Sequence, residues 1–110
     1  MSCYIRVKDA EVEQQGPSKT YLLLSDKQGS VKGCCSGLNL LLNEEYNTPG
    51  VHEDQEGFFV IEGTGWAKFG DEEFRLEPDM AMLAPAGVAH CMKKDPGAKV
   101  LKVLWFHAAI

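Results

Sequence analysis

Positive charge is scarce and scattered in this chain. Its 110 residues include 11 lysines and arginines against 16 aspartates and glutamates, which gives a net charge of −5. Lys93 and Lys94 form the only adjacent basic pair. Because binding to phosphates needs clustered positive charge, this composition argues against a nucleic-acid partner.

Long hydrophobic runs are also missing. The longest apolar stretches, residues 38–42 and 100–110, are too short or too interrupted to span a bilayer. The opening segment is charged by Arg6 and lacks the apolar core of a signal peptide. We therefore expect a cytoplasmic protein without a membrane partner.

The four cysteines follow no disulfide or zinc-binding pattern. Cys34 and Cys35 are neighbours, which cannot bridge without strain, and the spacing of Cys3, Cys34, Cys35 and Cys91 matches no zinc finger. We expect four free thiols, with Cys34 and Cys35 as a buried structural pair in a glycine-rich segment.

Motifs of several enzyme classes are absent from the sequence as well. It has no Ser-His-Asp order, no phosphate-binding glycine loop and no G-x-S-x-G. No stretch shows an apolar stripe of helical period with caps, and residues 9–15 could form one helical turn at most. These absences argue against the corresponding hydrolases and nucleotide-binding proteins, and against a helical fold.

What the chain has is a series of short β-like runs between Gly, Pro, Asp and Asn. They cover residues 3–7, 20–24, 38–42, 57–62, 66–69, 72–76, 80–83, 89–92 and 99–107. Turn signals roughly eight to twelve residues apart predict a sandwich or barrel. We expect one all-β domain over residues 1–110.

Two parts of this pattern locate the core. Gly70-Asp71 predicts a hairpin turn between residues 66–69 and 72–76, with Phe74 and Leu76 on one face of the second strand. Residues 58–61 and 103–106 are apolar on both faces. We expect each of these two runs between packed layers or at a subunit contact.

Residues 49–94 carry the most specific pattern of the sequence. Six residues separate Glu56 from Gly63, and His52 stands four positions before Glu56. This spacing resembles the first motif of the cupin family, in which H-x-H precedes a glutamate and a glycine. Gly50 stands where the first histidine of H-x-H belongs, and Glu44 where the motif's opening glycine belongs.

A second motif follows in PAGVAH. Pro85, Gly87 and His90 match the P-x-G-x-x-H element of the same family, with Asp79 in place of its leading glycine and Lys94 in place of its closing asparagine. The chain is therefore similar to small single-domain cupins. That resemblance implies a jelly-roll barrel of the double-stranded β-helix type.

The resemblance also implies a metal site. His52, Glu56 and His90 fall on ligand positions and supply two imidazoles and one carboxylate. This set suits non-haem Fe(II), and Mn, Co, Ni or Zn can also be held. Gly50 removes the fourth ligand, which weakens affinity and leaves coordination positions open. Asp54 lies two residues after His52, on the same face if the strand extends through both, and is the reserve ligand.

Each of these residues also has a purely structural interpretation. His90 can close a P-x-G turn with its side chain bonded to the backbone. His52 and Glu56 can lie in a solvated acidic turn, beside Glu53 and Asp54. The alternative to a metal protein is thus a degenerate barrel that binds no metal.

The side chains next to the candidate ligands predict a pocket. Alternation along the strands places Tyr46, Phe58 and Met92 on the inward face, in a largely apolar cavity typical of small-molecule sites. Cys91 is expected to point away from this face. His107, which ends the last apolar run, is interpreted as a satisfied edge residue.

The function that the resemblance implies is metal-dependent action on a small organic molecule, of the oxygenase, isomerase or lyase type. The alternative is a non-catalytic cupin that binds or senses a sugar or metabolite, with or without a metal. Small cupins commonly pair, and the two runs that are apolar on both faces offer a surface to bury. We therefore expect a homodimer.

Overall fold

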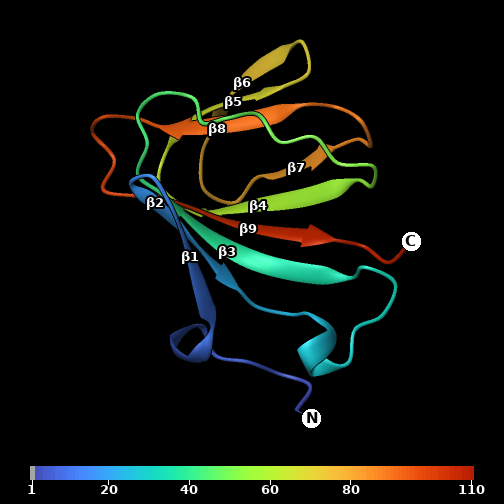
Figure 1. Cartoon of the computed structure of the whole chain (residues 1–110). Coiled ribbons are helices and arrows are strands. Elements are labelled where there is room, and N and C mark those ends of the chain that lie inside the picture. The colour runs from blue at the N-terminus through green and yellow to red at the C-terminus, as the bar shows by residue number, and fades with distance from the viewer. Residues whose placement is uncertain (1) are drawn as a thin grey trace.

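The computed structural model describes residues 2–110, and these residues form an antiparallel all-β structure (Figure 1). The strands are β1 (Glu11–Gln15), β2 (Ser18–Leu22), β3 (Cys35–Leu41), β4 (Glu56–Glu62), β5 (Gly65–Phe69), β6 (Glu72–Leu76), β7 (Ala81–Ala84), β8 (His90–Lys94) and β9 (Leu101–His107). Two short 3-10 helices, η1 (Val7–Asp9) and η2 (Asp26–Gln28), flank β1 and β2. No helix among the described residues is long and apolar enough to cross a membrane.

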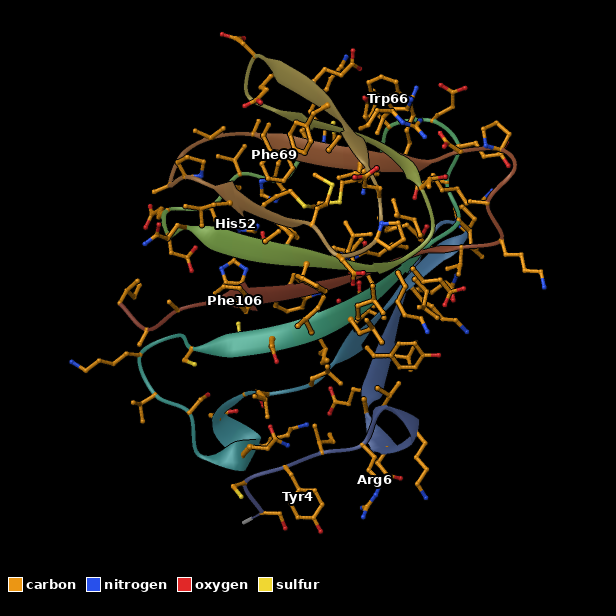
Figure 2. All side chains as sticks on the ribbon, turned by 180° about the vertical axis from the view of Figure 1, so that it is seen from behind. Tyr4, Arg6, His52, Trp66, Phe69 and Phe106 are labelled. Carbon is orange, nitrogen blue, oxygen red and sulfur yellow. The ribbon has the colours of Figure 1, made fainter. Side chains whose placement is uncertain are left out.

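The strands form two sheets that face each other. One sheet has the order β1-β2-β3-β9-β4-β7, and the other has the order β6-β5-β8, which lies above β4 and β9 in Figure 1. Side chains fill the space between the two sheets (Figure 2). The largest fully buried side chains, Val60, Leu76, Leu101 and Val103, come from both sheets. The predicted all-β barrel class is confirmed by this architecture.

Strand β4 shows how the two-sided apolar runs are used. Phe58 and Val60 point inward and are 4% and 0% exposed, whereas Phe59 and Ile61 point outward and are 40% and 44% exposed. The inner face of this run therefore packs between the sheets, as expected. Its outer face stays open in the single chain, so the subunit contact remains a prediction.

Two glycines let aromatic rings of β9 lie across the neighbouring strands. Gly37 on β3 is the register partner of Trp105, and a Cβ on Gly37 would lie 2.2 Å from the indole. Gly57 on β4 is the partner of Phe106, and a Cβ there would lie 2.3 Å from the phenyl ring. Because neighbouring residues of a strand face opposite sides, Trp105 enters the interior and Phe106 covers the outer face.

The predicted hairpin at Gly70-Asp71 is confirmed. Strands β5 and β6 pair from Phe69↔Glu72 onward, and Gly70 has a φ of 62°, a left-handed conformation that glycine adopts without strain. The expected run 72–76 coincides with β6. A Gly-Asp turn between alternating strands is thus read correctly from the sequence alone.

The strand predicted over residues 3–7 is wrong, because these residues form no strand. Residues 9–15 form no more than the one helical turn allowed for them, but the strand β1 that they contain was not predicted. Every residue of β1 is exposed, because β1 is the outermost strand of its sheet. An edge strand with water on both faces needs no apolar alternation, so the pattern that identified the other strands is missing.

The cysteines are all free, as expected. Cys3 and Cys34 are exposed and Cys35 is half-buried at the start of β3, so the expected buried pair at positions 34 and 35 is wrong. Cys91 on β8 is buried at 8% exposure. A glycine-rich sequence around Cys34 keeps that residue in a surface turn.

Candidate metal centre

The candidate ligands come from both sheets. Glu56 is the first residue of β4, His90 is the first residue of β8, and His52 lies in the loop before β4. That loop is tied to β8 by two backbone hydrogen bonds, from Gly50 N to His90 O (2.9 Å) and from His90 N to Gly50 O (3.0 Å). A further bond from Gly87 N to His52 O (2.8 Å) fixes the loop beside the P-x-G turn.

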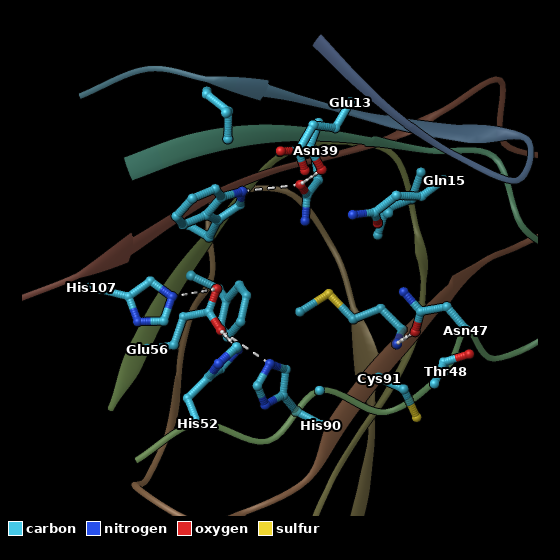
Figure 3. A pocket seen from close by; sticks show the side chains of 17 residues that line it. Glu13, Gln15, Asn39, Asn47, Thr48, His52, Glu56, His90, Cys91 and His107 are labelled. Atoms are coloured by element: carbon cyan, nitrogen blue, oxygen red, sulfur yellow. Dashed lines mark hydrogen bonds and ion pairs between the residues drawn. The ribbon is translucent and has the colours of Figure 1, made fainter. Parts of the chain in front are cut away.

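This arrangement brings the three predicted ligands together around one carboxylate oxygen (Figure 3). Oε1 of Glu56 lies 3.1 Å from Nε2 of His90 and 3.3 Å from Nε2 of His52. The three ligand atoms lie within 4.8 Å of one another, so this group could hold a metal ion. Oε1 is buried and has no hydrogen-bond partner among the described residues. Two imidazole nitrogens facing an unsatisfied carboxylate oxygen form a donor set that fits a divalent cation.

The His90 ring is held in place on several sides. Phe58 and Phe69 pack against it with ring centroids 5.4 and 5.7 Å away, and its side chain is 11% exposed. Its Nδ1 lies 3.4 Å from the carbonyl oxygen of Val88, which can only accept a hydrogen bond. With the proton on Nδ1, Nε2 presents its lone pair to the site. The neighbouring Glu56 carboxylate raises the pKa of His90, while burial of the ring opposes the shift.

Gly50 leaves one side of the group open. A Cβ at this position would lie 3.3 Å from Nε2 of His90 and 3.6 Å from Nε2 of His52. Position 50 therefore borders the site, where the resemblance places a fourth ligand. Without a side chain there, the space next to both imidazoles is left to solvent or to a bound molecule.

A cavity of about 380 Å³ adjoins the three residues, between the two sheets. Phe58, Met92 and Trp105 supply apolar wall, but polar side chains line as much of the cavity, so its expected largely apolar character is wrong. The polar lining comes from Glu13, Gln15, Thr20, Asn39, Asn47 and Thr48. Oδ1 of Asn39 accepts hydrogen bonds from Trp105 Nε1 (3.0 Å) and Thr20 Oγ1 (2.6 Å). Because both donors bond Oδ1, the amide nitrogen of Asn39 is turned toward the cavity, as Figure 3 shows.

Comparison with known proteins identifies the family. Residues 41–107 match the cupin domain family. The chain is a cupin. The family match covers more than half of the sequence and includes both motifs that contain the candidate ligands. No curated protein sequence matches this cupin at a significant level.

Solved structures match this cupin in fold. The polyketide cyclase RemF from Streptomyces resistomycificus has a TM-score of 0.79 at 17% identity, covering 94% of this chain and 76% of that one. A cupin 2 conserved barrel protein from Rhodopseudomonas palustris has a TM-score of 0.75 at 16% identity, covering 93% and 73%. Apo-HppE has a TM-score of 0.77 at 16% identity, and this cupin spans 57% of the HppE chain. At such identities the likeness establishes the cupin fold alone.

Two of the three predicted pocket residues line the cavity of this cupin. Phe58 and Met92 contribute to its wall, but Tyr46 lies outside it. The Tyr46 hydroxyl donates a hydrogen bond to Glu73 (2.6 Å), and Lys68 and Lys93 lie over its ring. The prediction assumed strand alternation through Tyr46. That assumption fails because residues 42–49 form no strand.

Asp54, the reserve ligand, lies outside the group of three. Its Oδ2 accepts a hydrogen bond of 2.7 Å from Nδ1 of His107, and this bond holds the pKa of Asp54 below its usual value. Nε2 of His107 lies 3.5 Å from Oε2 of Glu56, on the side away from His52 and His90. The carboxylate of Asp54 is thus hydrogen-bonded to His107 of β9 and does not join His52, Glu56 and His90.

The interpretation of His107 as an edge residue is wrong. His107 is the register partner of Glu56, and β9 is an interior strand of the six-stranded sheet. A signal was present in the sequence, because His107 shares parity with Val103 and Trp105 and both point inward. Alternation from the buried Val103 would have placed His107 at the site.

Proposed function

We propose that this cupin binds one divalent metal ion through His52, Glu56 and His90 and acts there on a small organic molecule. The observation that carries the proposal is the environment of Glu56 Oε1. This oxygen is buried without a hydrogen bond, and two imidazole nitrogens lie 3.1 and 3.3 Å from it. A buried ionised carboxylate is stable only with a partner, and a cation between the three side chains provides one.

The ligand set supports Fe(II) as the first metal to test. Two imidazoles and one carboxylate with open positions suit non-haem iron, and HppE, a distant neighbour in fold, has been solved as an Fe(II) protein. When bound, the ion supplies a Lewis acid with coordination positions available to a ligand. Mn, Co, Ni and Zn fit the same donors.

The cavity indicates which molecules fit beside the ion. Phe58, Met92 and Trp105 contact an apolar portion and exclude water from it. The amide nitrogen of Asn39 donates a hydrogen bond to an oxygen of the bound molecule. Gly50 leaves room next to both imidazoles for the portion of the molecule that reaches the ion. These features support a small molecule that carries oxygen atoms and an apolar portion.

Metal analysis tests the proposal. The protein is loaded with Fe(II) without oxygen, desalted and measured by elemental analysis, together with His90→Ala and with Glu53→Gln as an exposed control from the same loop. We expect about one equivalent of iron in the wild type and in Glu53→Gln, and less than about a tenth in His90→Ala. The loading is repeated with Mn, Co, Ni and Zn. If wild-type protein holds less than about a tenth of an equivalent of each of the five metals, the proposal is contradicted.

The second candidate is a cupin that binds a small molecule without a metal. Gly50, in place of the family's first histidine, favours it, because three ligands hold a metal less tightly than four. In that case the cavity next to Asn39 remains the binding site. A metal-free protein that still binds small molecules in ligand-observed NMR would identify this function.

A further inference from the structure

Asp54, His107 and Glu56 form a chain of contacts that ends at the candidate metal centre. Nδ1 of His107 lies 2.7 Å from Oδ2 of Asp54, and Nε2 of His107 lies 3.5 Å from Oε2 of Glu56. The other oxygen of Glu56, Oε1, faces His52 and His90. The side chains of Asp54, His107 and Glu56 are 20%, 13% and 9% exposed, so water competes little for these contacts.

We propose that Asp54 and His107 are positioning residues that hold Glu56 with Oε1 turned toward the two imidazoles. The inference rests on the proposed metal site and adds a second pair of residues to it. His107 acts through Glu56, and Asp54 acts through His107. Because Gly50 supplies no fourth ligand, this pair is what fixes the orientation of Glu56 in a site with only three ligands.

The chemistry of the donors supports this assignment. A carboxylate only accepts hydrogen bonds, so the 2.7 Å contact assigns a proton to Nδ1 of His107. That bond orients the ring so that its other nitrogen, Nε2, faces Oε2 of Glu56 at 3.5 Å. With Oε2 engaged, Oε1 is the oxygen of Glu56 that remains for a cation.

The fold keeps His107 in this orientation. His107 and Glu56 are register partners on β9 and β4, so their side chains project to the same face of the sheet. The rings of His52 and Trp105 pack edge-on against His107, with centroids 5.0 and 5.6 Å away. Ligand side chains oriented by such outer contacts bind metal more tightly, and loss of an outer partner typically lowers affinity about 10–100-fold.

The test is a Co(II) titration, with affinity and the visible spectrum of bound Co(II) as readouts. We expect His107→Leu to bind Co(II) about 10–100-fold more weakly than wild type, with a changed spectrum because both oxygens of Glu56 become available. In His107→Gln the amide nitrogen can occupy the place of Nε2, and we expect affinity to recover. His107→Asn reaches Asp54 but not Glu56, and we expect no recovery.

A second pair of variants tests Asp54. Asp54→Asn can still accept the hydrogen bond from Nδ1, whereas Asp54→Leu cannot, so we expect a larger loss of Co(II) affinity in Asp54→Leu. Glu53→Gln, an exposed neighbour, is the matched control and is expected to bind as wild type. Thermal unfolding of the metal-free variants shows which are folded. If a leucine variant unfolds, the comparison of His107→Gln with His107→Asn decides whether His107 positions Glu56.

The possible outcomes separate this inference from the proposed function. Co(II) binding that needs His90 but is unchanged in affinity and spectrum in His107→Leu overturns the positioning role and leaves the metal site standing. A loss in His107→Leu that His107→Gln does not restore also overturns it, and makes the imidazole itself a ligand. If wild-type protein binds no Co(II), both the proposed metal site and the positioning role are overturned.

Discussion

Oε1 of Glu56 lies 3.1 Å from Nε2 of His90, although Glu56 begins β4 of one sheet and His90 begins β8 of the other. Both residues therefore stand at the same end of the barrel, where two strands of opposite sheets start. A metal ion bound by both would link the sheets at that end. Metal binding is then coupled to the stability of the whole fold as well as to chemistry.

The first prediction concerns Glu56→Gln. The amide keeps the shape of the side chain but removes the negative charge, so we expect Co(II) to raise the unfolding temperature of wild type and not of the variant. At a free Co(II) concentration of about 100 times the dissociation constant, the wild type should gain about 2.7 kcal/mol. Thermal unfolding with Co(II) and with a chelator measures the difference.

The metal-free forms supply the control for this prediction. Metal-free Glu56→Gln is compared with metal-free wild type, so that the effect of the substitution on the fold itself is separated from the loss of Co(II) binding. A variant that is still stabilised by Co(II) to the wild-type extent would show that Glu56 is not a ligand.

The second prediction concerns Gly50→His. Position 50 borders both imidazoles, and the cupin motif places a histidine there. A fourth nitrogen donor should tighten Co(II) binding by about tenfold or more, after the His90 ring moves by a few tenths of an ångström. Isothermal titration with Co(II) measures the change. Gly50→Ala adds a Cβ without a donor, and equal affinities in the two variants would contradict the prediction.

The three candidate ligands could be predicted from the sequence because their spacing is local. His52 and Glu56 lie four residues apart, and His90 ends a short P-x-G-x-x-H element. Motif spacing does not identify Asn39 or His107, although alternation from Val103 indicates that His107 points inward. They stand on β3 and β9, and only the pairing of β3, β9 and β4 brings them to the same cavity. Register between distant strands is not encoded in the spacing within any one motif.

Strand alternation was reliable only where a strand exists. It placed Phe58 and Met92 correctly because both belong to regular strands with one buried face. It failed for Tyr46, which lies in a loop, and for β1, which has no buried face at all. Apolar and polar residues alternate clearly only where one face of a strand is buried. Edge strands and loops are therefore the parts of a small barrel that sequence periodicity misses.

The third prediction concerns Gly37→Ala. The new methyl group would lie 2.2 Å from the Trp105 indole, and the ring cannot move without losing its hydrogen bond to Asn39. We expect a loss of about 1–3 kcal/mol in the free energy of unfolding, measured by chemical denaturation. Gly97→Ala is the control, because a Cβ at Gly97 meets nothing within 4 Å. Equal losses in both variants would show that the loss does not come from the contact with Trp105.

The fourth prediction concerns the outer face of the six-stranded sheet. Phe59, Ile61, Leu83 and Phe106 are 40%, 44%, 54% and 47% exposed, and cross-strand pairing gathers them on one face. An apolar face of this kind would be buried if two copies associated, and such a contact would explain why β4 and β9 are apolar on both faces. We expect wild type to sediment as a dimer and Phe106→Glu as a monomer, because the mutation places a charge in the contact. Val31→Glu, at an exposed apolar residue in the loop before β3, should remain a dimer. A wild type that stays monomeric at concentrations of about 100 μM would rule out this face as a stable subunit contact.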